Sequence, residues 1–399
     1  MPELPQPFFG AVVNGVDVYP QDKISYRIDT DYTTPADGWS FTVYREDSAK
    51  LRAAFQPWMP VELYIDGKLI LFGRIEDVEG DGTGALHVSG VDYLGDIIRG
   101  QVDPTTKFKK DDTLGDAILR VLSPFGITKL ESNGYAATRS LLTGKTPKDK
   151  TPPRDFNAVK LDEFKVGYSQ GAFETANRIA ARHGFTLQPG ASRDSIALAE
   201  PDYEQAAIGT IRRDAGSNVV NARARRNWSN VPTQVTVVSK AKGKRGAQTG
   251  RVTIPAFGDG APNKLASVPE VQRILAAVTS APKFEVEDLP ELGVIGGALT
   301  VLRPLYHQDK EARNDEQIER VARRILADKL RDTLTYECTV VGHKDPKTGA
   351  RYAPDTMWNV IDPIEGVEEQ LWILGRTFRN DGQGAMTDLR MIRPYTWVL

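Results

Sequence analysis

The sequence predicts an α+β protein that is mainly β, with two related antiparallel β-barrel domains, a small α/β domain and an inserted subdomain. Three observations predict this class. Short alternating apolar runs recur near both ends of the chain, helical spacing is confined to a few stretches, and one hairpin pattern occurs twice. The chain has 399 residues, 40% of them hydrophobic, which suits roughly two to four domains.

Residues 1–100 are expected to form the first β-barrel domain. Tight turns are indicated by Asn14-Gly15, Asp66-Gly67 and Asp81-Gly82, because these pairs tolerate the positive φ values that short hairpins need. Between the turns, apolar residues alternate with polar ones at Ile24/Tyr26/Ile28, Trp39/Phe41/Val43 and Val61/Leu63/Ile65. This spacing of short strands favours a small barrel or sandwich.

Residues 101–206 are expected to form the small α/β domain. A first helix has its apolar stripe between Leu114 and Leu122, before Pro124 and Gly126 end the run. A second helix is predicted over 172–183, followed by Gly184 in the left-handed position of a helix cap, and then by a hairpin over 185–198. The segment 143–157, rich in proline, glycine and lysine, is expected to be an exposed loop.

The second β-barrel domain is assigned to residues 207–240 and 333–399, and the inserted subdomain to 241–332. In the insert, a stripe of apolar residues at three- and four-residue spacing predicts an amphipathic helix at about 314–331. A strand with one buried face follows, because Leu334, Tyr336, Cys338 and Val340 alternate with polar residues. Weaker patterns indicate strands at 251–255, 284 and 299–302 and a short helix at 271–278.

One hairpin pattern occurs in both β regions. Residues 69–90 contain Gly73-Arg74 and then Asp81-Gly82-Thr83-Gly84-Ala85, and residues 371–392 contain Gly375-Arg376 and then Asp381-Gly382-Gln383-Gly384-Ala385. Chance similarity of two Asp-Gly hairpins is the alternative. If the pattern reflects a duplication, three chains would present six similar β domains in a ring.

Composition excludes several classes of protein. The formal net charge of −2 and the pI of about 6.2 give no general reason to bind nucleic acid or an anionic membrane. Cys338 is the single cysteine, which excludes internal disulfides and fits a reducing compartment. No apolar run is long enough to span a bilayer, and no signal peptide is evident. We expect a soluble protein, made in the cytoplasm, with no stable membrane insertion.

Ser169 is the strongest candidate for a catalytic residue. It lies in Gly167-Tyr168-Ser169-Gln170-Gly171, which matches the G-x-S-x-G turn that projects a nucleophilic serine. That turn depends on a parallel sheet of βα units, whereas the preceding residues are predicted to form antiparallel hairpins. We therefore expect the Ser169 hydroxyl to cap the helix that follows. A serine esterase or cell-wall hydrolase using Ser169 remains the alternative from a different class.

Other candidate sites are weaker. Gly144-Lys145-Thr146 lacks the first glycine of a phosphate-binding loop, since position 139 is Arg139. The histidines, at 87, 183, 307 and 343, show no spacing typical of metal ligands. Adjacent acids on a strand point to opposite faces, which disfavours a glycosidase pair at Glu76/Asp77, Glu287/Asp288 or Glu368/Glu369. We expect no catalytic residue, no cofactor and no metal site.

A local basic cluster comprises the arginines at 212, 213, 223, 225 and 226, with Trp228 nearby. Such a cluster suits nucleic acid or an acidic protein surface, and the near-neutral chain favours the protein surface.

The order of parts resembles the baseplate hub proteins of contractile-tailed phages, especially the Mu-type hub. Four stretches carry the resemblance: residues 61–73, ending in Gly73; residues 171–187, between the two β regions; Arg303-Pro304-Leu305; and Tyr352-Ala353-Pro354 leading to residues 360–366. None of them is a catalytic motif.

The resemblance implies a homotrimer in which two tail-tube-like β domains per chain form a pseudo-sixfold ring. Such a hub is a symmetry adaptor in the tail baseplate of the virion, assembled in the host cytoplasm. It joins the hexameric tail tube or its initiator protein to the trimeric central spike, with baseplate wedge and tape-measure proteins as further partners. DNA passes through the lumen only in transit during genome ejection, so we expect a neutral or acidic lumen. The hub of a phage-derived contractile injection system is the alternative reading.

Overall fold

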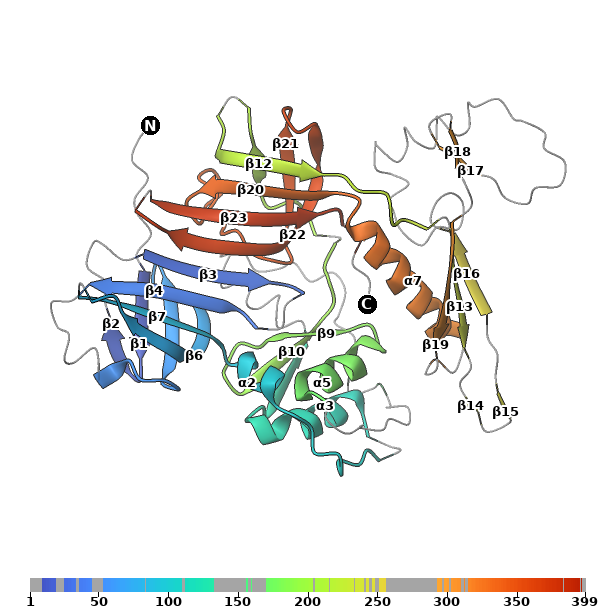
Figure 1. The fold of residues 1–399 in the computed structure, drawn as a ribbon, viewed down its shortest axis with the longest axis horizontal. Coiled ribbons are helices and arrows are strands. Elements are labelled where there is room, and N and C mark those ends of the chain that lie inside the picture. The colour runs from blue at the N-terminus through green and yellow to red at the C-terminus, as the bar shows by residue number, and fades with distance from the viewer. Residues whose placement is uncertain are drawn as a thin grey trace. The chain divides into compact units, whose positions relative to one another are not determined.

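The computed structural model describes residues 9–18, 25–33, 36–44, 53–82, 84–109, 112–132, 156, 159, 170–203, 205–214, 216–232, 234–239, 242–243, 246–247, 251–255, 293–295, 298–300, 303–309, 312, 315–382, 384–394 and 396 (Figure 1). The chain divides into two compact units. The first unit contains Met1–Arg223 and Tyr336–Met391, and the second contains Ala224–Thr335 and Ile392–Leu399.

The early strands alternate buried and exposed residues as predicted. They are β1 (Phe9–Val13), β2 (Val16–Val18), β3 (Ser25–Asp31), β4 (Gly38–Tyr44), β5 (Pro60–Ile65), β6 (Lys68–Gly80) and β7 (Ala85–Asp92). In β5, Val61, Leu63 and Ile65 are fully buried, while the residues between them are half-buried. All pairings among these strands are antiparallel. The mainly β, antiparallel class is therefore confirmed.

The predicted turns have the expected backbone. Asn14 and Gly15 have φ values of 49° and 76°, and Asp66 and Gly67 have φ values of 51° and 69°. Two consecutive positive φ values define the turn type that matches the twist of a two-residue hairpin. The turn residues thus set the register of β1 with β2 and of β5 with β6.

A small α/β region follows β7 in the sequence and precedes the next strands of the large sheet. It contains α2 (Leu94–Arg99), α3 (Leu114–Leu122), η1 (Ser123–Phe125), β8 (Lys129–Ser132), α5 (Ala172–Ala181), β9 (Thr186–Pro189) and β10 (Ser195–Ala199). Its sheet has the order β8-β10-β9, with β8 parallel to β10. Helices α3 and α5 bury their apolar stripes in one core with Leu187, Ile196 and Leu198. Gly184 has a φ of 83°, which confirms the predicted left-handed residue after α5.

Replacing Thr113 with alanine is expected to lower the free energy of unfolding by about 1 kcal/mol. Thr113 caps α3: its hydroxyl accepts a hydrogen bond from the Asp116 backbone N–H at 3.1 Å, and the Asp116 carboxylate accepts one from the Thr113 N–H at 3.1 Å. Thr113→Ser keeps the acceptor and is the matched control. Urea unfolding of both variants measures the difference, and equal stability of the alanine and serine variants would contradict the capping role.

A second set of strands comes from two stretches of the sequence, one before and one after the second unit. It comprises β11 (Thr210–Arg212), β12 (Val219–Arg225), β20 (Thr335–Val341), β21 (Met357–Asp362), β22 (Val367–Asn380) and β23 (Ala385–Ile392). These strands and the early ones form a 13-stranded sheet, which runs β12-β20-β23-β22-β3-β4-β7-β6-β5-β1-β2, with β21 and β11 branching from β22. Figure 1 shows β22 beside β3, where the two sets join.

The same strand order occurs twice in this sheet. The first set is ordered β3-β4-β7-β6-β5-β1, and the second is ordered β12-β20-β23-β22-β21-β11. Corresponding strands also follow each other in the same sequence along the chain, apart from the extra strand β2. We name these sets repeat 1 and repeat 2. They differ in the last pairing, since β1 is antiparallel to β5 and β11 is parallel to β21.

The predicted hairpin repeat is confirmed in the backbone. A long strand of 13 residues in β6 and 14 in β22 leads to strands of 8 residues each, β7 and β23. In the turns, Gly82 and Gly84 have φ values of 78° and 111°, and Gly382 and Gly384 have values of 82° and 105°. These values are accessible chiefly to glycine, so both turns depend on the same two glycine positions.

The second unit has its own sheet and helix. The sheet contains β16 (Arg251–Pro255), β13 (Gln234–Ser239) and β19 (Pro304–Asp309), in that order, and the helix is α7 (Asp315–Arg331). Two short pairs of strands are β14 (Lys242–Gly243) with β15 (Gly246–Ala247), and β17 (Gly293–Ile295) with β18 (Ala298–Thr300). The α7 stripe of Ile318, Ala322 and Leu326 packs in one core with Val235 and Val237.

The assignment of residues 207–240 to the second barrel is wrong at its end. β13 pairs with β16 and β19, and it belongs to the second unit together with α7. The alternation of Val235 and Val237 correctly indicated a strand, but alternation does not specify which sheet a strand joins. The expected helix at 271–278 and the strand at residue 284 lie outside the described residues. None of the described helices is long and apolar enough to cross a membrane.

Candidate functional site

One face of the 13-stranded sheet is polar over eight neighbouring strands. Successive side chains on a strand point to opposite faces, so the buried residues of each strand define a polar row on the other side. In β3, Tyr26 and Ile28 are buried while Arg27 is exposed, and in β20 Tyr336 and Cys338 are buried while Glu337 is exposed.

We name this surface the polar face. It consists of Asn221 and Arg223 on β12, Glu337 and Thr339 on β20, Asp388 and Arg390 on β23, Thr377 and Arg379 on β22, Arg27, Asp29 and Asp31 on β3, Ser40 and Thr42 on β4, His87 and Ser89 on β7, and Asp77 and Glu79 on β6.

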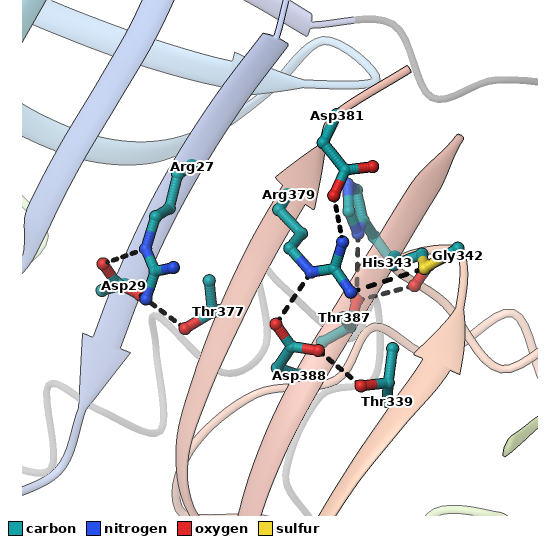
Figure 2. Close-up of polar contacts among 11 residues, drawn as sticks. Arg27, Asp29, Thr339, Gly342, His343, Thr377, Arg379, Asp381, Thr387 and Asp388 are labelled. Atoms are coloured by element: carbon teal, nitrogen blue, oxygen red, sulfur yellow. Dashed lines mark hydrogen bonds and ion pairs between the residues drawn. The ribbon is translucent and has the colours of Figure 1, made fainter. Parts of the chain in front are cut away.

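Ion pairs and hydrogen bonds connect neighbouring strands across this face (Figure 2). Arg379 donates from Nε to Asp388 at 2.9 Å, and the other carboxylate oxygen of Asp388 accepts a hydrogen bond from Thr339 at 2.7 Å. Asp29 accepts two hydrogen bonds from Arg27, at 2.8 and 2.9 Å, and one from Thr377 on the neighbouring strand. The hydrogen bond to Asp388 raises the pKa of Arg379 above its ordinary value.

The face is hollowed where β12, β20, β23, β22 and β3 lie side by side. The hollow has a volume of about 500 Å³ and is lined by both charge types, including Arg223, Glu337, Asp388 and Arg390. The residues named above contain six carboxylates and four guanidinium groups, and Arg225 on the same side of β12 adds a fifth, which gives a formal charge of −1. The face is therefore polar and slightly acidic, and most of its arginines are neutralised by neighbouring carboxylates.

The histidines are dispersed over the structure. His87 lies on the polar face and contacts the Thr42 hydroxyl at 3.2 Å, His307 lies on β19, and His343 is buried. His183 follows α5. Among the described residues, no cluster of three histidine, cysteine or acidic side chains could hold a metal ion.

The enzyme candidates gain no supporting geometry. Ser169 and Gly144-Lys145-Thr146 lie outside the described residues. The N-cap residue of α5 is Gly171, which supplies no side-chain cap, and the expected contribution of the Ser169 hydroxyl at this helix entry stays a prediction.

Two of the three acidic pairs lie on described strands. Glu76 forms an ion pair with Arg99, whereas Asp77 belongs to the polar face. Glu368 and Glu369 lie on the part of β22 that pairs with β21, and Glu287/Asp288 lies outside the described residues.

The predicted basic cluster is divided among several places. Arg212 pairs with Asp214, and Arg213 lies 3.7 Å from carboxylate oxygens of both Asp362 and Glu365. Arg223 alone of these three belongs to the polar face. The arginines and acids of β3, β22 and β23 were not predicted to form a common surface. The alternation of charged and apolar residues in each strand does indicate that they share one face of a sheet.

The comparisons with known proteins concern the fold. No family model and no curated protein matches the chain. The tail protein of Neisseria meningitidis MC58 is similar in structure, with a TM-score of 0.69, 18% identity and 98% of each chain covered. The 43 kDa tail protein of prophage MuSo2 from Shewanella oneidensis gives a TM-score of 0.68 and 17% identity over 98% of this chain and 99% of that one.

A more distant neighbour comes from a secretion apparatus. The E. coli c3393 protein, a component of the type VI secretion system with structural similarity to T4 tail proteins gp27 and gp5, gives a TM-score of 0.51 and 8% identity. The comparison covers 98% of this chain and 78% of that one. The fold of this chain is therefore that of phage tail proteins, as the resemblance to baseplate hubs implies.

Proposed function

We propose that this protein is the structural hub of a contractile tail baseplate, in which three copies form a ring with pseudo-sixfold symmetry. The observation that carries the proposal is the repeated strand order, because each chain contains two equivalent sets of strands in one sheet. Three copies then offer six equivalent sets. Such a ring can match a hexameric tail tube on one side and a trimeric spike on the other, which makes the hub a symmetry adaptor.

The polar face is the proposed wall of the channel through the ring. A charged, hydrated surface suits a water-filled channel, whereas the opposite face of the sheet is apolar and buried. DNA in transit would be retarded by unpaired arginines, since each phosphate contact strengthens binding. The carboxylates paired with Arg27, Arg379 and Arg390 therefore favour free passage of DNA during ejection.

The proposed partners are the central spike protein and the tail tube or tube-initiator protein, with wedge and tape-measure proteins at the rim. The virion tail is the proposed location, after assembly in the host cytoplasm. Similarity to a type VI secretion component favours one second candidate, the hub of a phage-derived injection system, because the same symmetry match is needed there. No described geometry favours an enzyme.

Purified protein is expected to have three times the mass of the 44.0 kDa chain. Light scattering and native mass spectrometry measure this mass. Electron microscopy of the same sample should show a ring with six similar densities around a channel lined by the polar face. A protein that stays monomeric at micromolar concentration, or a ring with the polar face outside, would overturn the proposal.

A further inference from the structure

The outer edge of repeat 1 is covered within the chain. β3 is the outermost strand of repeat 1, and it pairs antiparallel with β22 of repeat 2, from Asp31 opposite Gly375 to Tyr26 opposite Asn380. The backbone groups along this edge of β3 are therefore satisfied by a strand of the other repeat.

In the described residues, no strand pairs with the corresponding edge of repeat 2, and we call an edge open in this sense. β12 occupies in repeat 2 the place of β3 in repeat 1, and it is the last strand of the sheet on that side. Val220 on β12 is 51% exposed, although it lies in a strand of a large sheet. An exposed edge strand with an apolar residue invites pairing with another strand.

A matching edge exists on β6, which corresponds to β22. The first half of β6 pairs with β5 as far as Arg74, and Ile75 is bonded through its backbone to Trp58 and Met59. Beyond that point, residues 76–80 pair with β7 on one edge only, among the residues that the structure describes. In repeat 2, the equivalent part of β22 is the segment that β3 covers.

The two open edges carry opposite charges. On β6, Asp77 and Glu79 are exposed, and on β12, Arg223 and Arg225 are exposed. None of these four side chains forms an ion pair with another described residue. Asp77 lies opposite Ser89 and Glu79 opposite His87, so both acids belong to the polar face, which also includes Arg223.

We propose that β12 of one copy pairs antiparallel with residues 76–80 of β6 in a second copy. The contact copies the β22–β3 junction of the single chain, with Arg223 and Arg225 facing Asp77 and Glu79. It joins two different edges, so its repetition forms a ring when the rotation from copy to copy is 120°, and it makes the sheet and the polar face continuous from copy to copy. The inference rests on the proposed trimeric hub and names the surfaces that hold it together.

Charge reversal tests the contact. The basic-edge variant is Arg223→Glu/Arg225→Glu, the acidic-edge variant is Asp77→Arg/Glu79→Arg, and the swapped variant carries all four changes. Each two-residue variant places like charges along the contact and is expected to weaken association by at least about 100-fold. The swapped variant restores opposite charges and is expected to return to within about tenfold of the unaltered protein.

The controls separate association from folding. Lys68→Glu/Lys347→Glu changes the charge by the same amount as the basic-edge variant, at exposed positions away from both edges, and should leave association unchanged. Circular dichroism and thermal unfolding should be alike for all variants. Mixing the basic-edge variant with the acidic-edge variant should produce association that neither shows alone. In the mixture, β12 of each variant meets a β6 edge of opposite charge on the other variant.

The outcomes distinguish the two proposals. If the unaltered protein is not trimeric, the proposed hub and the inferred contact both fail. If the unaltered protein is trimeric and either two-residue variant remains equally trimeric, the β12–β6 contact is wrong and the hub stands. Loss of association in both variants without recovery in the swapped variant would also overturn the pairing of these two edges.

Discussion

Replacement of Trp372 with alanine is expected to lower the free energy of unfolding by about 4 kcal/mol. Trp372 lies on β22, is fully buried, and contacts the rings of Tyr32 and Tyr203 with centroid distances of 4.9 and 5.3 Å. Its indole N–H also donates to the Asp355 carboxylate at 3.0 Å. The substitution removes these contacts and leaves a cavity beside Tyr32, at the junction of the two repeats.

Two matched variants isolate the cause. Trp372→Phe keeps an aromatic ring in the core but loses the hydrogen bond, so its cost should lie near 1–2 kcal/mol. Trp58→Ala makes the same change at a position that is 69% exposed, and we expect a change below about 0.5 kcal/mol. Urea unfolding followed by circular dichroism compares the three. Similar losses at positions 372 and 58 would show that Trp372 does not hold the junction.

Local features of the fold could be predicted because they depend on neighbouring residues. The Asp-Gly turns at 81–85 and 381–385 require glycine for their positive φ values, so the repeat was visible in two short stretches of sequence. The apolar stripe of α7 likewise needs only three- and four-residue spacing. The predicted helix at about 314–331 coincides with α7 for this reason.

Long-range pairing could not be predicted in this way. The pairing of β22 with β3 joins residues about 350 positions apart, and the residue pattern of one strand does not specify which strand it pairs with. β13 was assigned to the wrong sheet for the same reason. The polar face depends on such pairings, since Arg390 meets Asp31 only because the two repeats share one sheet. A neutral or acidic lumen was expected from the resemblance to baseplate hubs, but the residues that would line it could not be identified from the sequence.

Acid is expected to destabilise the protein through His343. This side chain is buried, and burial together with the nearby cations Arg376 and Arg351 lowers the pKa of His343 to about 3. In the unfolded chain its pKa is about 6.5. Between these values the unfolded state binds a proton that the folded state does not, so stability present above pH 6.5 is lost as the pH falls. The loss reaches about 3 kcal/mol at pH 4.5.

The hydrogen bonds explain why the neutral ring is preferred. Thr387 donates its hydroxyl proton to the Gly342 carbonyl at 2.6 Å, so its oxygen accepts from His343 Nδ1 at 3.0 Å. This network assigns the proton to Nδ1, and Nε2 then accepts from the Tyr26 hydroxyl at 2.7 Å. Protonation of Nε2 would place two donors against each other. Among the described residues, Asp66 also lies near this cluster and forms an ion pair with Lys344.

Two acids change the stability in the opposite direction as the pH falls. The contribution of His343 must therefore be measured as the difference in stability between the unaltered protein and a variant at each pH. Desolvation raises the pKa values of the partly buried Asp37 and the buried Asp92, and both acids therefore favour the folded state as the pH falls. His343→Gln offers similar hydrogen-bonding groups without the titration. The stability advantage of the unaltered protein over this variant should shrink by about 3 kcal/mol between pH 7.5 and 4.5.

Asp37→Asn supplies the control with the opposite sign. The stability of the unaltered protein relative to this variant should rise over the same pH range, because Asp37 gains a proton in the folded state. Denaturant unfolding at four or five pH values gives both curves. Parallel curves for the His343→Gln variant and the unaltered protein would mean that His343 is protonated in the folded state. Tyr26 on β3 could then no longer donate to Nε2, and the polar link between the two repeats would have to be assigned to other residues.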